Sequence, residues 1–93
     1  MRTSANNLKK MNDYLDMLDN HANESFNRFM FDQNENNRIE YLIRFDSILN
    51  KLLGIEFYFN HLPKFVQKLN ISKVNQKINC IRMLLVNANY INQ

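Results

Sequence analysis

Apolar side chains recur along this chain at steps of three and four, the spacing that places residues on one face of an α-helix. The first run consists of Leu8, Met11, Leu15, Leu18, Ala22, Phe26 and Phe29. It stays in phase through the polar stretch DNHAN, residues 19–23, which favours one continuous helix. Similar apolar runs follow along the rest of the chain. Together these runs predict three long helices and one short helix, over about residues 5–31, 37–61, 63–69 and 72–91.

The later helix boundaries depend on the one glycine and the one proline of the chain. Gly54 could end a helix, but the aromatic segment after it has no second strand to pair with, so we expect the helix to continue, at a cost of roughly 1 kcal/mol. Pro63 suits the start of the short helix, which Phe65, Val66 and Leu69 would anchor, and Ser72 suits the N-cap of the last helix. The expected fold is an all-α, small antiparallel bundle forming a single domain.

The polar segment DQNENNRIEYLI, which begins at Asp32, can be compared with a calcium-binding loop. Its first, third and fifth residues carry suitable oxygens, but position 12 requires a bidentate glutamate and is occupied by Ile43. Helix capping explains the same residues, because Asn37 and Glu40 have the spacing of a capping box. Asp32 and Glu35 have that spacing too. We therefore expect no metal site in this segment and no cofactor.

Side chains with catalytic chemistry are few and scattered. His21 and His61 lie on different expected helices, and neither has a cysteine or carboxylate at a spacing typical of a metal site or of a nucleophile and its base. One glycine cannot form a glycine-rich phosphate loop. We therefore expect a protein that is not an enzyme.

Composition also bears on the compartment. Cys80 is the single cysteine, so an intrachain disulfide is impossible and a reducing compartment is expected. The N-terminal sequence lacks the apolar core of a signal peptide, and no apolar segment is long enough to span a membrane. These features predict a cytoplasmic protein without a membrane partner. Frequent Asn, Lys and Ile indicate an AT-rich genome, such as that of a low-GC bacterium or its phage.

Charge is divided unevenly along the chain. Residues 1–50 hold six Lys and Arg against eight Asp and Glu, whereas residues 51–93 hold six against one. The expected acidic strip on the first helix consists of Asp13, Asp16 and Glu24. The expected basic patch consists of Lys64, Lys68, Lys73, Lys77 and Arg82. The basic patch could neutralise several phosphates, but it lacks a helix-turn-helix frame and aromatic platforms, so a solvated basic surface is the favoured interpretation.

The last helix is apolar on two faces. One apolar line consists of Val74, Ile78, Ile81, Leu85 and Ala88. Met83, Val86 and Tyr90 fall on the side away from this line. The interior of one bundle cannot use both faces, so either the helix is covered on two sides or its second face binds another molecule. Tyr and Met are enriched at interfaces, although both are also ordinary core residues.

These patterns predict a small non-catalytic helical protein that binds a protein target, as an inhibitor, an adaptor or an immunity-type factor does. The predicted partner-binding residues are Met83, Val86 and Tyr90. Its acidic and basic halves would also allow a homodimer. The alternative prediction is a nucleic-acid-binding protein that uses the basic patch.

Overall fold

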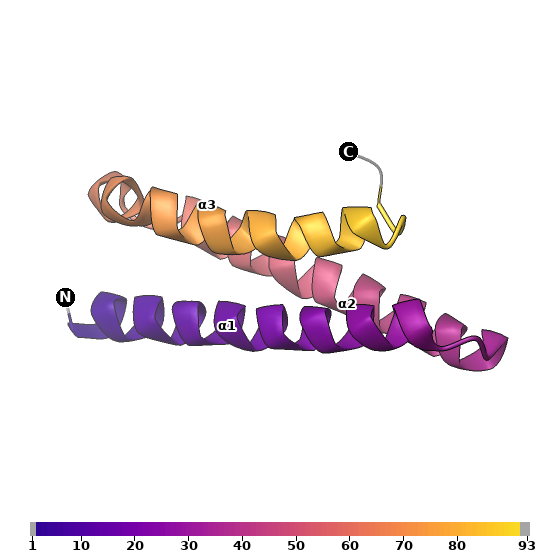
Figure 1. The fold of residues 1–93 in the computed structure, drawn as a ribbon. Coiled ribbons are helices and arrows are strands. Elements are labelled where there is room, and N and C mark those ends of the chain that lie inside the picture. Colours follow the sequence, from indigo (N-terminus) through magenta and orange to yellow (C-terminus); the bar gives the residue numbers. More distant parts are fainter. Residues whose placement is uncertain (1, 92–93) are drawn as a thin grey trace.

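The computed structural model describes residues 2–91, with side chains from residue 7 onward. Within this range the chain forms three helices, α1 (Arg2–Phe31), α2 (Glu35–Asn60) and α3 (Lys64–Asn87), and no strand. In Figure 1, α1 and α3 run in the same direction and α2 runs back diagonally behind them. The molecule is long and flat, measuring 49 × 24 × 16 Å. The predicted all-α bundle is thus confirmed in its class. No helix in residues 2–91 has both the length and the hydropathy needed to cross a membrane.

The three helices pack through the apolar faces that the spacing predicts. The central cluster of buried side chains contains Met11, Leu15, Leu18 and Ala22 from α1, Ile48, Leu52, Ile55 and Phe59 from α2, and Val74, Ile78 and Ile81 from α3. A second cluster contains Phe29, Phe45, Leu85 and Ala88. Removing this apolar surface from water, at roughly 25 cal/mol per Å², is the main force that holds the helices together.

The connection between α1 and α2 is built from hydrogen bonds to polar side chains. Asn34 is the N-cap of α2, and its Oδ1 accepts hydrogen bonds from the backbone N–H groups of Asn36 and Asn37 at 3.0 and 3.4 Å. Asp32 Oδ1 accepts one from the N–H of Asn34 at 2.9 Å, which forms an Asx turn. Neither Asn37 nor Asp32 caps the helix as predicted, because Asn34 already binds its free N–H groups and α2 starts at Glu35.

The helix α2 continues through Gly54, as predicted, and ends at Asn60. The chain turns at Pro63, and α3 begins directly after it. Nε2 of Gln67 donates hydrogen bonds to the carbonyl oxygens of Asn60 and Leu62, at 3.1 and 2.7 Å. A side chain of α3 therefore satisfies carbonyl groups that the end of α2 leaves free.

The predicted division between a short helix and a last helix is wrong, because α3 is one helix over residues 64–87. Ser72, the predicted N-cap, lies inside it. Starting a new helix would leave N–H groups without partners, whereas serine in a helix interior costs only about 0.5 kcal/mol. Val66, Asn70 and Val74 also follow one another at four-residue steps, so the inner face of the helix stays in phase.

The helix α3 ends at Asn87, earlier than the predicted residue 91. Asn89 takes a left-handed conformation with φ of 58°, and its N–H donates a hydrogen bond to the carbonyl of Val86. The N–H of Tyr90 donates to the carbonyl of Leu85. These two bonds form a Schellman motif, with Asn89 in the position that glycine usually takes. Tyr90 therefore lies outside the helix.

Candidate functional site

Tyr90 is separated from the other two residues predicted to bind a partner, because it lies beyond the end of α3. Met83 is 53% exposed on α3, and Val86 is half-buried. Tyr90 packs against Phe45 with the ring centroids 5.9 Å apart, and its hydroxyl donates a hydrogen bond to Oδ1 of Asp46 at 2.9 Å. Met83 is therefore the member of this set with the largest exposed fraction, while Tyr90 makes contacts within the molecule.

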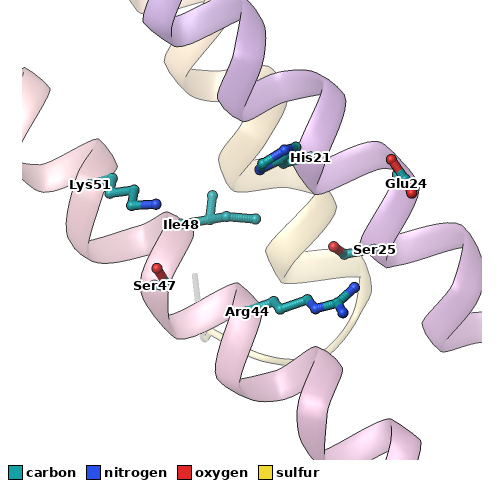
Figure 2. Close-up of a pocket in the computed structure, with 7 residues that line it drawn as sticks. All are labelled: His21, Glu24, Ser25, Arg44, Ser47, Ile48 and Lys51. Carbon is teal, nitrogen blue, oxygen red and sulfur yellow. The ribbon is translucent and has the colours of Figure 1, made fainter.

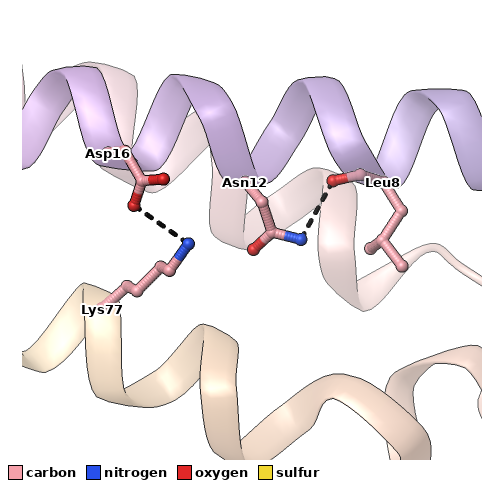
Figure 3. Close-up of polar contacts among 4 residues, drawn as sticks. All are labelled: Leu8, Asn12, Asp16 and Lys77. Carbon is pink, nitrogen blue, oxygen red and sulfur yellow. Dashed lines mark hydrogen bonds and ion pairs between the residues drawn. The ribbon is translucent and has the colours of Figure 1, made fainter.

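The acidic strip and the basic patch meet within the molecule. Lys77 Nζ lies 2.9 Å from Asp16 Oδ1, and this ion pair joins α3 to α1 (Figure 3). Arg82, another residue of the basic patch, pairs with Glu56 of α2. The Asp16–Lys77 pair thus joins the two oppositely charged halves of the chain, whereas Arg82 and Glu56 both belong to residues 51–93.

The remaining charges of both sets lie at the surface. Glu24 pairs with Arg28 of the same helix at 2.8 Å, and Asp13 is exposed. Three members of the basic patch are exposed and form no ion pair with any residue that the structure describes, namely Lys64, Lys68 and Lys73. The part of the basic patch that is free to meet a partner is therefore the first half of α3.

The outer face of α3 carries large apolar side chains that the sequence analysis placed elsewhere. Phe65 and Leu69 were expected to anchor a short helix, but they are 60% and 82% exposed. Because α3 is one helix, their phase is set by Val74, from which they lie about 180° and 140° around the helix axis. Met83 lies about 180° from Val74 as well. We call Phe65, Leu69 and Met83 the outer face of α3.

Exposed large apolar side chains lie around both turns of the bundle, with Met30, Phe31, Ile39 and Ile43 near the turn between α1 and α2 and others near the turn between α2 and α3. Among the described residues, six large apolar side chains between positions 53 and 71 are exposed: Leu53, Phe57, Tyr58, Phe65, Leu69 and Ile71. Phe57 is 68% exposed and stacks on His61, with the ring centroids 4.2 Å apart. Clusters of exposed apolar side chains on a small protein are typical of interaction sites.

A cleft of about 340 Å³ lies between α1 and α2. Its lining residues are His21, Glu24, Ser25, Arg44, Ser47, Ile48 and Lys51. Figure 2 shows the side chains of His21, Arg44 and Lys51 extending from the two helices into the space between them. The sequence pattern does not predict this cleft, because the spacing within one helix does not show which residues of another helix lie opposite it.

Two open grooves flank the bundle. One, of about 550 Å³, runs past Gly54 between α1 and α2 and is lined by Met11, Tyr14 and Tyr58 among others. The other, of about 590 Å³, lies between α1 and α3 and includes Met83. Both are shallow and continuous with the surface, so they can add contact area to a neighbouring interface.

The polar residues of the segment that resembles a calcium-binding loop form hydrogen bonds with one another and with α1. Nδ2 of Asn37 donates a hydrogen bond to Asp32 Oδ2 at 3.1 Å. Arg38 donates to the carbonyl of Phe29 at 2.6 Å and lies over the ring of that residue, 4.0 Å from its centroid. Within residues 2–91, no group of three or more His, Cys, Asp and Glu side chains is arranged to hold a metal ion.

Comparisons of this chain with protein-family models, with curated proteins and with solved structures found no match. Its function is therefore argued from its own surfaces.

Proposed function

We propose that this protein is a non-catalytic helical binding protein, and that it contacts a protein target through the outer face of α3. The observation that carries the proposal is the exposure of Phe65 and Leu69, at 60% and 82%. Two apolar side chains four residues apart on a helix lie next to each other. In water such a pair gains nothing for the isolated bundle, whereas burial of apolar side chains of this size against a partner contributes about 1.5–3 kcal/mol each.

The fold does not need these two side chains. The same helical turns also carry Val66 and Asn70, which are half-buried. Nδ2 of Asn70 donates a hydrogen bond to the carbonyl of Val66 at 2.8 Å. The outer side chains can therefore be changed while the inner contacts of α3 stay in place.

Lysines beside the apolar pair indicate the chemistry of the target. Lys64 and Lys68 are exposed, four residues apart, and lie directly before Phe65 and Leu69 in the sequence. Lys73 is exposed one turn further along α3. Opposite charges around an interface speed association and favour the correct partner. The complementary target surface is thus an apolar pocket with an acidic rim.

The test compares two matched double variants in affinity capture from a lysate of the native host, with the captured proteins identified by mass spectrometry. Phe65→Ser with Leu69→Ser is expected to remove one specific protein that the wild-type chain retains. Ile39→Ser with Ile43→Ser is the control, because these residues are 52% and 64% exposed at the start of α2. Circular dichroism should show all three proteins equally helical, since surface substitutions usually change stability by about 0.5 kcal/mol or less.

Size-exclusion chromatography with light scattering tests whether the target is a second copy of the chain. A dimer that becomes a monomer in the Phe65→Ser, Leu69→Ser variant, and not in the control, would make the interaction a self-association. Equal loss of the captured protein in both double variants would contradict the proposal, because the outer face of α3 would then have no special role.

Nucleic acid binding is the second candidate function, and the three exposed lysines without ion pairs favour it. It predicts that affinity for a generic DNA or RNA falls steeply between about 50 and 200 mM salt. It also predicts a loss of binding when Lys64, Lys68 and Lys73 are changed to Gln. The proposed protein interaction instead survives moderate salt and depends on Phe65 and Leu69.

A further inference from the structure

The cleft between α1 and α2 gathers nitrogen-bearing side chains from two helices. Arg44 and Lys51 lie two helical turns apart on α2, and His21 faces them from α1 (Figure 2). The volume of about 340 Å³ falls in the range of about 300–1,000 Å³ that small-molecule sites occupy.

The lining of this cleft carries more positive than negative charge, with Arg44 and Lys51 against Glu24. Neither Arg44 nor Lys51 forms an ion pair with a residue in the described part of the chain. Glu24 is the one carboxylate in the lining, and it is held by Arg28 at 2.8 Å. An excess of positive charge on a concave surface creates a field that attracts an anion.

Polar and apolar groups complete the cleft. Ser25 is 5% exposed and Ile48 is 4% exposed, so both are fixed by the packing of the helices. Ser47 adds a second hydroxyl beside Arg44. Hydroxyl groups can donate hydrogen bonds to anionic oxygens, and the Ile48 side chain supplies the apolar contact that small-molecule sites usually contain.

We infer that this cleft binds the phosphate group of a small molecule, with Arg44, Lys51 and His21 in contact with it. A phosphate carries up to two negative charges near neutral pH and presents oxygens in several directions. Donors that approach from two helices therefore fit it better than they fit a planar carboxylate. The fork of the Arg44 guanidinium can bind two of its oxygens at once.

This site is separate from the outer face of α3, so its test does not depend on the proposed protein target. The probe is inorganic phosphate, added to ¹⁵N-labelled protein at constant ionic strength, with chloride as the matched titrant. The expected result is a saturable set of amide shifts confined to residues 21–25 and 44–51, with half-saturation at about 1 mM. Chloride should leave these amides unshifted.

Two variants with the same change of charge give the decisive comparison. Arg44→Gln with Lys51→Gln should weaken phosphate binding about tenfold or more. Lys9→Gln with Lys10→Gln removes two exposed charges from the start of α1 and should leave the binding constant unchanged. Equal weakening in both variants would overturn the inference, as would shifts that grow linearly with phosphate or appear equally with chloride. Lys51→Gln alone provides the answer if the double variant fails to fold.

Discussion

The hydroxyl of Tyr90 donates a hydrogen bond to Oδ1 of Asp46 at 2.9 Å, and so joins the last described turn of the chain to the middle of α2. The ring of Tyr90 lies on Phe45, which is itself in edge contact with Phe29. The residues after α3 are thereby attached to the second buried cluster, and the position at which the helix ends decides where this tyrosine lies.

Tyr90→Phe is expected to lower the free energy of unfolding by about 0.5–1 kcal/mol, because one partly exposed hydrogen bond is lost while the ring contacts remain. Urea denaturation at neutral pH measures this change. Tyr58→Phe is the control, since Tyr58 is an exposed tyrosine whose hydroxyl forms no hydrogen bond with the described residues. An equal change in both variants would contradict a specific bond to Asp46.

The same tyrosine predicts a dependence of stability on pH. Burial raises the pKa of Tyr90 above its ordinary value of about 10, and the hydrogen bond to Asp46 and the charge of that carboxylate raise it further. The folded state therefore holds this proton more tightly than the unfolded chain does. The resulting stability is complete below about pH 10 and is lost as the pH rises through the folded-state pKa. Denaturation between about pH 8 and 11 should show a smaller decrease for Tyr90→Phe than for the wild type.

Gly54→Ala is expected to stabilise the protein by roughly 1 kcal/mol, because glycine in a helix interior has more conformational freedom to lose on folding. A Cβ atom at this position would meet nothing within 4 Å. Thermal denaturation followed by circular dichroism should show a higher melting temperature. A lower one would mean that α2 needs glycine at this point.

Ser72→Ala and Asn34→Ala are expected to change stability in opposite directions. Ser72 lies inside α3, so alanine should raise the free energy of unfolding by about 0.5 kcal/mol. Asn34 caps α2 through its side chain, so its loss should cost about 1 kcal/mol. Chemical denaturation of both variants distinguishes one continuous α3 from two helices. A loss of stability in Ser72→Ala would support a helix start at this residue.

The two ion pairs between helices should contribute unequally to stability. Asp16 and Lys77 have side chains 60% and 23% exposed, whereas Glu56 and Arg82 are 27% and 36% exposed. Double-mutant cycles with Asn and Gln replacements should give a coupling free energy of about 0.5 kcal/mol for the first pair and about 1 kcal/mol for the second. Both should decrease in about 1 M salt, because screening weakens charges near the surface. Coupling that does not change with salt would show that packing, rather than charge, joins these residues.

Local sequence patterns predict α1 and α2 as single helices, and they predict the apolar faces that pack in the core. The spacing of Leu15, Leu18 and Ala22, for instance, predicts the buried side of α1, and all three are 0% exposed. The segment after Gly54 has no second strand to pair with, and for this reason we correctly predicted that α2 continues through Gly54. Such features depend on interactions within one helix and on which side chains avoid water, and both are written in the local pattern of residues.

The contacts between residues of different helices are set by the way the helices pack. The last two predicted helices form one helix, α3, so Phe65 and Leu69 lie on its outer face. This helix ends before Tyr90. The packing of the helices also brings Lys77 next to Asp16 and forms the cleft between α1 and α2. These outcomes depend on how the helices cross and where their ends lie, and packing fixes both through contacts between residues that are far apart in the sequence.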